Sequence, residues 1–166
     1  DSNIVYGVKG VFMRILVISD SHGNTRNIER AVESQPEANI IIHLGDGADD
    51  IVDLEFVYRD KQFYQVAGNC DWGSSLPLEG ELKVADKTIF FVHGHEYRVK
   101  TNLQQIKMEA RKRNADIVLF GHTHLPITEY DDELYLLNPG SLQYADGTYG
   151  IIDITDAGIS VQIIKV

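Results

Sequence analysis

The sequence predicts an α/β fold in which two packed mixed β-sheets are flanked by helices, as a four-layer αββα sandwich. Three observations predict it. Short apolar runs alternate with amphipathic stretches in the first half, short strands are separated by tight turns in the second half, and polar motifs follow the apolar runs. The chain has 166 residues, 43% of them hydrophobic, and no internal repeat, so residues 13–166 are predicted to form one domain.

The first half predicts five elements in the order strand, helix, strand, helix, strand. Their predicted bounds are 14–19, 24–34, 39–44, 49–58 and 62–67. The first strand carries the continuous run Ile-Leu-Val-Ile, which is typical of a strand covered on both faces. The first helix places Ile28, Ala31 and Val32 on one face, and Asn24 or Thr25 can cap it. This order of elements is typical of a parallel sheet.

The second helix is predicted from Ile51, Leu54 and Val57, which recur at i, i+3 and i+6. Asp49 and Asp50 open this helix, where capping alone explains a carboxylate. We expect Asp49 to act behind the metal ligands described below and assign no function to Asp50.

The second half predicts a helix between pairs of short strands. Strands are expected over residues 81–85, 88–92 and 116–120, and a helix over 101–114. Thr101 with Gln104 has the spacing of a capping box, and Leu103, Ile106 and Ala110 form the inner stripe of the helix. Tight turns are predicted at Asp86–Lys87, Asp131–Asp132, Asp146–Gly147 and Asp156–Gly158.

Charge and cysteine content exclude several classes of protein. The formal net charge of −10 repels polyanions and argues against nonspecific binding of nucleic acid. The basic run 111–113 lies at the end of a predicted helix, where cations complement the helix dipole, so we interpret it as a solvated face. With one cysteine, no secretory signal and no long apolar run, the chain predicts a cytoplasmic protein without a membrane role.

The N-terminal residues 1–12 precede Met13, which resembles an internal start, and they carry no motif. They predict an extension that forms either an edge strand or a disordered tail. The apolar hairpins of the second half favour assembly of the domain into a dimer or tetramer.

Seven potential metal ligands lie in short motifs directly after apolar runs. They are Asp20, His22, Asp46, Asn69, His93, His122 and His124. Because the carboxyl ends of parallel strands meet at one edge of a sheet, these side chains are expected to converge and to hold two divalent cations about 3.5–4 Å apart. Carboxylate and imidazole without a thiolate cluster suit Mn²⁺, Fe²⁺, Zn²⁺, Ni²⁺ or Mg²⁺.

The spacing within the motifs adds two expectations about the backbone. Asp20 and His22 are two residues apart, as are His122 and His124, so in an extended segment both members of each pair project to one side. A glycine precedes a ligand in three of the motifs, and we expect these glycines to permit sharp turns; they are Gly45, Gly68 and Gly121.

Taken together, the motifs resemble those of the calcineurin-like metallophosphoesterase superfamily, over about residue 13 to the end of the chain. The segments 68–71 (Gly-Asn-Cys-Asp) and 138–141 (Asn-Pro-Gly-Ser) are most similar to the small prokaryotic phosphodiesterases of the YfcE type. Those enzymes also resemble the noncatalytic Vps29 scaffold of retromer. In such proteins the 138–141 turn is expected to pack beneath the metal site.

The resemblance implies a role for each ligand. The first metal is assigned to Asp20, His22 and His124, the second to Asn69, His93 and His122, and the bridge between them to Asp46. It also implies that a hydroxide bridging the metals attacks the phosphorus of a small phosphate ester, with the Asn69 amide stabilising the phosphoryl oxygens. Mn²⁺ is the first expectation for the metal, with Ni²⁺, Zn²⁺, Fe²⁺ and Mg²⁺ as alternatives.

One departure from the broader family concerns the leaving group. Many relatives carry a histidine directly after the Gly-Asn pair, next to the departing oxygen, where this chain has Cys70. The proton is then expected from Asp71, from His95 or from a metal-bound water, unless the enzyme relies on substrates with good leaving groups. The catalytic candidates are therefore Asn69, Asp71 and His95.

Three neighbouring side chains have plainer interpretations. His43, at the end of a buried strand, is expected to be a hydrogen-bonded core residue or to orient a ligand rather than bind metal. Cys70 is interpreted as a wall of the site, because little around it in sequence favours a thiolate. Trp72 belongs to the core or the rim, with an aromatic wall for the substrate as the alternative.

Three classes of function follow. The first is a metal-dependent phosphodiesterase or phosphatase, which the complete set of ligands favours. A noncatalytic Vps29-like scaffold is the alternative, although such scaffolds usually have an eroded site. A nuclease with the same dinuclear site is the third, and the charge of −10 argues against it.

Overall fold

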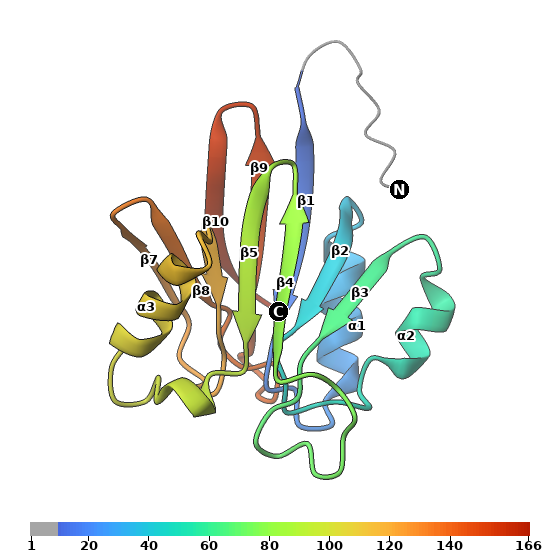
Figure 1. Cartoon of the computed structure of the whole chain (residues 1–166). Helices are drawn as coiled ribbons and strands as arrows, with labels where there is room; N and C mark the ends of the chain where they lie inside the picture. The colour runs from blue at the N-terminus through green and yellow to red at the C-terminus, as the bar shows by residue number, and fades with distance from the viewer. Residues whose placement is uncertain (1–9) are drawn as a thin grey trace.

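The computed structural model describes residues 10–166, whose strands form two five-stranded mixed sheets (Figure 1). The first sheet has the order β10-β9-β1-β2-β3 and the second the order β4-β5-β6-β8-β7. Helices lie outside both sheets, so the predicted αββα sandwich is confirmed. Whether residues 1–9 form a strand or a tail lies outside the described residues, and β1 begins at Phe12.

The elements follow one another in the predicted order. The first sheet and its helices are β1 (Phe12–Ile18), α1 (Thr25–Ser34), β2 (Ala38–His43), α2 (Val52–Val57), β3 (Gln62–Gln65), β9 (Thr148–Thr155) and β10 (Gly158–Lys165). The second sheet and its helices are β4 (Glu79–Val84), β5 (Lys87–Val92), the 3-10 helix η1 (His95–Tyr97), α3 (Gln104–Lys112), β6 (Ile117–Leu119), β7 (Ile127–Asp131) and β8 (Leu134–Asn138).

Strand β1 explains why its sequence is apolar at every position. Ile15 and Val17 face the second sheet and share one cluster with residues of β5 and β6, whereas Leu16 and Ile18 face α1 and pack on its residue Ile28. Successive side chains of a strand point to opposite faces, so a strand between a sheet and a helix must be apolar on both. On the far side, α3 covers the second sheet in a third cluster.

The parallel pairings place the carboxyl ends of the central strands at a common edge. β2 pairs in parallel with both β1 and β3, and β6 pairs in parallel with both β5 and β8. The long loop between β3 and β4, green in Figure 1, extends beyond the sheets at this edge. Every polar motif of the sequence analysis therefore emerges on the same side of the molecule.

Helix α2 is shorter than predicted, and its inner face is different. Ile51 and Leu54 are buried, but Val57 is 71% exposed, so its assignment to the core was wrong. Tyr58 packs against the cluster instead. The reason is the helical period: i+7 returns to the face of i, whereas i+6 lies well to one side.

Helix α3 begins at Gln104 rather than Thr101, and the predicted capping box does not form. The N-cap residue is Leu103, which makes no side-chain capping bond; the side chain of Asn102, one residue earlier, accepts a hydrogen bond from the Gln104 amide at 3.0 Å. Asparagine competes well with threonine at such positions because its short side chain reaches the backbone two residues on.

Two of the predicted turns are displaced by one residue. Val84 pairs with Lys87, so the turn consists of Ala85 and Asp86, both with positive φ. Asp131 likewise pairs with Leu134, which moves that turn from Asp131–Asp132 to residues 132–133. Two-residue hairpin turns with two positive φ angles match the twist of the strands, and the pairing of apolar residues fixes the register more strongly than the turn composition.

Among residues 10–166, no helix combines the length and the apolar character that crossing a membrane requires.

Candidate metal centre

All seven predicted ligands lie together where strands of both sheets end. Asp20 and His22 follow β1, Asp46 follows β2 and Asn69 follows β3, while His93 follows β5 and the remaining two histidines follow β6. Within residues 10–166, three groups of donor atoms could hold a cation: Asp20, His22 and His124; Asp46, His93 and His122; and His22, Asp46 and Cys70. The first two correspond to the two predicted metals. The geometry of each group decides whether the expectation of two cations is chemically reasonable.

The first group consists of Asp20, His22 and His124. Asp20 Oδ1 lies 3.2 Å from His124 Nε2 and 3.8 Å from His22 Nε2. The other oxygen, Asp20 Oδ2, accepts hydrogen bonds from Ser19 Oγ at 2.5 Å and from the His122 amide at 3.1 Å. Oδ1 itself is buried and finds no hydrogen-bond partner within residues 10–166. A buried carboxylate oxygen left facing two imidazole nitrogens fits a cation, because an unpartnered charge there is costly.

The second group brings His93 and His122 together with Asp46, and the predicted ligand Asn69 lies beside His93. His93 Nε2 lies 3.0 Å from Asn69 Oδ1 and 3.2 Å from His122 Nδ1. On the other side of the ring, His93 Nδ1 donates a hydrogen bond to the Leu44 carbonyl at 2.8 Å. That bond places the ring proton on Nδ1 and leaves the Nε2 lone pair free for a metal.

Asp46 lies between the two groups. Its Oδ2 is 3.3 Å from His93 Nε2 and 3.8 Å from His22 Nε2, whereas its Oδ1 accepts the Cys70 amide at 2.8 Å. Burial opposes ionisation, but the hydrogen bonds from His93 and Cys70 outweigh it and hold the pKa of Asp46 well below its usual range. An ionised carboxylate in this position is suited to bridging two cations.

The imidazoles of the second group respond to burial in different ways. Burial, together with the neighbouring His93, lowers the pKa of His122 to about 4, so this ring is neutral at pH 7. Burial also opposes protonation of His93, but the hydrogen bond to Asp46 and the charges of Asp20 and Asp46 raise its pKa. A proton and a cation therefore compete for His93 Nε2.

The backbone that presents the ligands is not extended, contrary to our expectation for the two paired motifs. Asp20 and His22 have φ of 52° and 43°, and His122 and His124 have φ of 70° and 62°. Asp46 is left-handed as well, with φ of 59°. Each such residue costs on the order of 1–3 kcal/mol, and strain of this kind is typical of functional sites.

Two of the three motif glycines are required by close approach rather than by a turn. A Cβ atom on Gly68 would lie 2.1 Å from Asp46 Oδ1 and 2.5 Å from the Asp46 amide nitrogen. A Cβ atom on Gly121 would lie 2.1 Å from Ser19 Oγ. Only Gly45, with φ of 106°, has the positive φ expected of a sharp turn.

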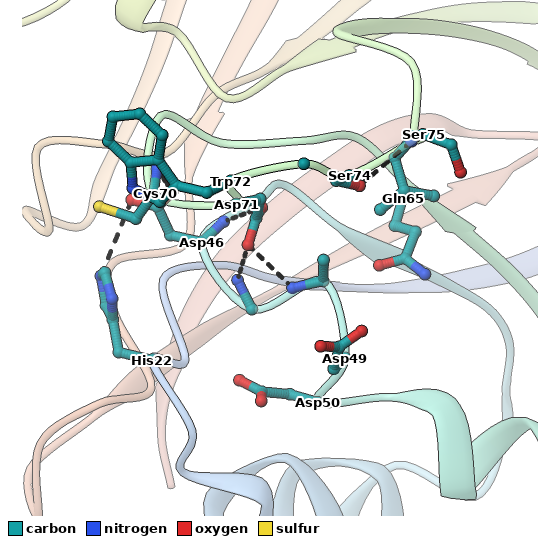
Figure 2. Close-up of a pocket in the computed structure, with 14 residues that line it drawn as sticks. His22, Asp46, Asp49, Asp50, Gln65, Cys70, Asp71, Trp72, Ser74 and Ser75 are labelled. Carbon is teal, nitrogen blue, oxygen red and sulfur yellow. Dashed lines mark hydrogen bonds and ion pairs between the residues drawn. The ribbon is translucent and has the colours of Figure 1, made fainter.

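Asp71 acts as an acceptor for backbone amides (Figure 2). Its carboxylate accepts four hydrogen bonds at 2.8–3.0 Å, from the amides of Asp46, Gly47, Ala48 and Gly68. Partial burial opposes ionisation, but these four bonds together lower the pKa of Asp71. A carboxylate stabilised in this way is a poor proton donor, so the structure points to a positioning role for Asp71 rather than the acid role.

His95 lies beside the second group. Its ring centroid is 5.5 Å from that of His93 and 6.1 Å from that of His122. Its Nδ1 is buried and has no hydrogen-bond partner in the part of the chain that the structure describes. Burial and the neighbouring His93 lower the pKa of His95. Its place beside the second group suits a contact with the substrate, but the lowered pKa disfavours the protonated ring that a proton donor needs.

Cys70 and Trp72 lie on the rim of the site. Partial desolvation and the neighbouring carboxylate of Asp46 raise the pKa of Cys70, which disfavours a reactive thiolate. The Trp72 side chain is 92% exposed, so it belongs to the rim and not to the core.

A buried chain of hydrogen bonds supports the first group from behind. Gly45 donates its amide proton to His43 Nδ1 at 3.0 Å, so the proton of this ring is on Nε2, which donates to Ser21 Oγ at 2.9 Å. Ser21 Oγ in turn donates to Asp50 Oδ2 at 2.6 Å. His43 is thus a hydrogen-bonded core residue, as expected. The carboxylate that supports the ligands from behind is Asp50, and not Asp49 as expected. Ser21 is fully buried and receives rather than gives a hydrogen bond at His43, so it is no nucleophile.

Two further side chains hold the site from outside the ligand set, and sequence reasoning identified the segment of the first and missed the second. Ser141 Oγ donates to the Asp20 carbonyl at 2.7 Å, which places the 138–141 turn beneath the site as the resemblance implied. Tyr144 Oη lies 3.1 Å from His124 Nδ1 and orients that ring. No motif marks Tyr144, because its contact depends on a turn that brings it back across 20 residues.

The buried state of His43 predicts a pH dependence of stability. Burial lowers its pKa from 6.5 to about 4, so below pH 6.5 the unfolded chain binds a proton that the folded chain does not. The free energy of unfolding should therefore fall by about 3 kcal/mol between pH 6.5 and 4 through this group alone. Urea unfolding at pH 7 and pH 4 measures the fall, and His43→Gln, which cannot titrate, should show a correspondingly smaller one. Equal falls in the two proteins would contradict the assignment.

Comparison with known proteins agrees with the geometry. A family model described as the calcineurin-like phosphoesterase superfamily domain matches residues 13–157. The probable metallophosphoesterase YsnB of Bacillus subtilis is 32% identical over 133 residues, which cover 79% of this chain and 76% of YsnB. Phosphodiesterase YfcE of Escherichia coli is 25% identical over 169 residues, which cover 85% of this chain and 88% of YfcE.

The fold is also that of a trafficking protein. The structure of vacuolar protein sorting 29 (Vps29) from Cryptosporidium parvum matches with a TM-score of 0.73 at 16% identity, covering 93% of this chain and 98% of that protein. Since the family model spans most of the chain, and YsnB aligns across more than two thirds of it, the chain belongs to the calcineurin-like phosphoesterase superfamily.

Proposed function

We propose that this metal-dependent phosphoesterase is a phosphodiesterase that hydrolyses a small phosphate ester at a dinuclear metal centre. The observation that carries the proposal is Asp46, whose Oδ2 lies between the nitrogen of His22 in one group and that of His93 in the other. An ionised carboxylate that faces two separate sets of donors suits a pair of cations better than one.

The side chains fit this metal pair in their charge and in their orientation. Asp20 and Asp46 supply negative charge, and His93 is fixed by the Leu44 carbonyl so that its free nitrogen faces the site. When bound, the two cations supply a hydroxide nucleophile at neutral pH and stabilise charge on the phosphoryl oxygens. Asn69 can direct its amide group at the phosphate, and the neutral ring of His95 can donate a hydrogen bond to the substrate. The mixture of carboxylate, amide and imidazole donors suits Mn²⁺ first.

A small diester is favoured over a nucleic acid. The relative YfcE is named a phosphodiesterase, which supports diester hydrolysis in this chain. The formal charge of −10 disfavours a long polyanion, whereas a single phosphate can be attracted by the bound cations alone. A cytoplasmic location is consistent with the single cysteine.

A noncatalytic scaffold is the second candidate because the fold of Vps29 is so similar. All seven donor positions carry metal-binding side chains here, and this completeness favours catalysis. Metal content and activity together distinguish the two functions.

The test is to purify the protein without added metal and to determine the bound ions by mass spectrometry, then to titrate Mn²⁺ during hydrolysis of bis-p-nitrophenyl phosphate. We expect up to two ions per chain and activity that rises with Mn²⁺. A panel of monoesters, diesters and cyclic nucleotides then defines the substrate class. Two bound ions without turnover of any ester, under any divalent cation, would favour the scaffold.

The absence of a histidine at position 70 predicts a preference for good leaving groups. Cys70 is a weak acid, and burial lowers the pKa of His95 and so disfavours its protonated ring, which leaves a departing alkoxide without a strong proton donor among these two side chains. Aryl diesters should therefore turn over about 10²-fold or more faster than alkyl diesters, since aryl leaving groups need little protonation. Comparing kcat for p-nitrophenyl ethyl phosphate and diethyl phosphate tests this expectation, and equal rates would remove its basis.

A further inference from the structure

A cavity opens directly from the candidate metal centre. It has a volume of about 680 Å³, and His22 and Asp46 belong both to its wall and to the ligand set. This volume is in the range of small-molecule sites. A phosphate held at the ligands would thus place its attached organic group in this cavity.

The cavity wall is strongly one-sided in charge. Four aspartates line it, namely Asp46, Asp49, Asp50 and Asp71. None of the described residues that line it is lysine or arginine. Asp50 and Asp71 are partly compensated by hydrogen bonds, and Asp46 faces the cations, but Asp49 is exposed to the cavity. An organic group with its own negative charge would be repelled here, and a cation would be attracted.

The wall also contains a hydrogen-bond acceptor that has no donor among the residues that the structure describes. Gln65 lines the cavity, and its Oε1 is buried without a hydrogen-bond partner in the described part of the chain. Figure 2 shows Gln65 and Asp49 on the side of the cavity away from His22. A bound group that donates hydrogen bonds, or carries positive charge, would satisfy both side chains.

Trp72 supplies an apolar face at the rim. Its indole is 92% exposed and is drawn above Cys70 in Figure 2. The loop that carries it is anchored at both ends, by the four amides bound to Asp71 and by the bond from the Ala67 amide to the Pro77 carbonyl at 2.9 Å. The exposure of Trp72 is therefore built into an ordered loop, and an indole face attracts cations and flat groups.

We propose that this cavity selects the organic group of the substrate. It admits uncharged and, above all, cationic groups such as alkylammonium, with Trp72 as the stacking face and Asp49 and Gln65 as acceptors. Esters that carry a second phosphate or a carboxylate are disfavoured. The inference rests on the proposed phosphodiesterase function and assigns to Trp72 and Asp49 a role in specificity rather than in bond cleavage.

Three esters with the same chromophore test the selection: p-nitrophenyl phosphorylcholine, p-nitrophenyl ethyl phosphate and p-nitrophenyl 2-carboxyethyl phosphate. Because the leaving group is constant, differences report the other organic group. We expect kcat/KM to be about tenfold higher for the cationic than for the anionic ester, with the neutral ester between them. Equal values for the three esters would overturn the proposal.

Variants assign the effect to residues. Trp72→Ala should lower kcat/KM for the choline ester about fivefold by raising KM. The kcat/KM for the anionic ester should change less than about twofold. Asp49→Asn should reduce the ratio of kcat/KM for the cationic ester to kcat/KM for the anionic ester. Added salt should reduce the same ratio. Phe56→Ala removes an aromatic side chain that is 68% exposed on α2 and serves as the matched control with no expected change. An equal loss for all three esters in Trp72→Ala would contradict a role in selection.

A binding measurement separates this inference from the proposed function. Trp72 is the only tryptophan in the chain, so intrinsic fluorescence reports on it alone. With Mg²⁺ present, phosphorylcholine should shift the emission and protect it from iodide quenching, whereas phosphoglycolate at the same concentration should not. Failure of both ligands to act on Trp72 in an active enzyme refutes the inference alone. Absence of hydrolysis with the phosphorylcholine response intact refutes the proposed function alone.

Discussion

Replacing Asp46 with asparagine should lower kcat/KM for bis-p-nitrophenyl phosphate by about 10³-fold or more, which corresponds to about 4 kcal/mol of lost transition-state stabilisation. Asparagine has the same shape, and its Oδ1 can still accept the Cys70 amide that Asp46 holds at 2.8 Å. What it lacks is the charge at Oδ2, the atom that faces both His22 and His93. The variant therefore removes the bridge and leaves the fold in place.

Metal content gives the same prediction a second readout. Without the shared carboxylate, the variant should bind fewer ions at a given Mn²⁺ concentration, and the pKa of His93, which Asp46 raises, should fall. Asp53→Asn changes an exposed carboxylate on α2 and should keep its activity within about twofold. Wild-type activity in Asp46→Asn at saturating Mn²⁺ would show that the two groups of ligands do not work as one centre.

The architecture was readable from the sequence because its signals are local and strong. The run from Ile15 to Ile18 is apolar at every position, and the structure shows why: Ile15 and Val17 pack between the sheets, and Leu16 and Ile18 pack under α1. The same signal separates strands from helices in the first half. Where the signal was composition alone, as at Asp86–Lys87, the pairing of the strands decided the turn.

The convergence of the ligands was readable for a different reason. Parallel strands place their carboxyl ends at one edge, so a motif after each strand reaches the same place. The direction in which each side chain points could not be predicted from the sequence. The left-handed φ angles of Asp20, His22, His122 and His124 depend on loops that are fixed from a distance, such as the hydrogen bond from Ser141 to the Asp20 carbonyl. An extended segment was the natural assumption for two ligands two residues apart, and the assumption failed on long-range contacts.

The roles of the acidic residues near the site show the same limit. Asp49 and Asp50 are adjacent in the sequence, and only the fold distinguishes them: Asp50 accepts from Ser21 and from the Gly23 amide, whereas Asp49 lies open to the cavity. Asp71 was a candidate acid because it follows Asn69 and Cys70 in the motif. The four amides that it binds come from two loops that meet only in the folded chain.

Asp71 provides the second prediction with a large effect. In Asp71→Asn, the side-chain NH₂ must face one set of amide donors that now contact a carboxylate oxygen, at Asp46 and Gly68 on one oxygen or at Gly47 and Ala48 on the other. Loss of two charge-assisted hydrogen bonds, reduced for their partial exposure to solvent, should lower the free energy of unfolding by about 2–3 kcal/mol. Because these amides hold the loop of Asp46 against that of Asn69, kcat/KM should fall by about 10²-fold as well.

The pattern of that loss distinguishes positioning from acid catalysis. If Asp71 only holds the two loops, aryl and alkyl diesters should lose activity by the same factor, and urea unfolding should show the lower stability. If Asp71 donates the proton, the alkyl diester should lose far more than p-nitrophenyl ethyl phosphate, whose leaving group needs little protonation. The lowered pKa of Asp71 argues for the first outcome, since a carboxylate that stays ionised at pH 7 has no proton to give. A selective loss of alkyl diester hydrolysis, with unfolding unchanged, would return Asp71 to the role of acid.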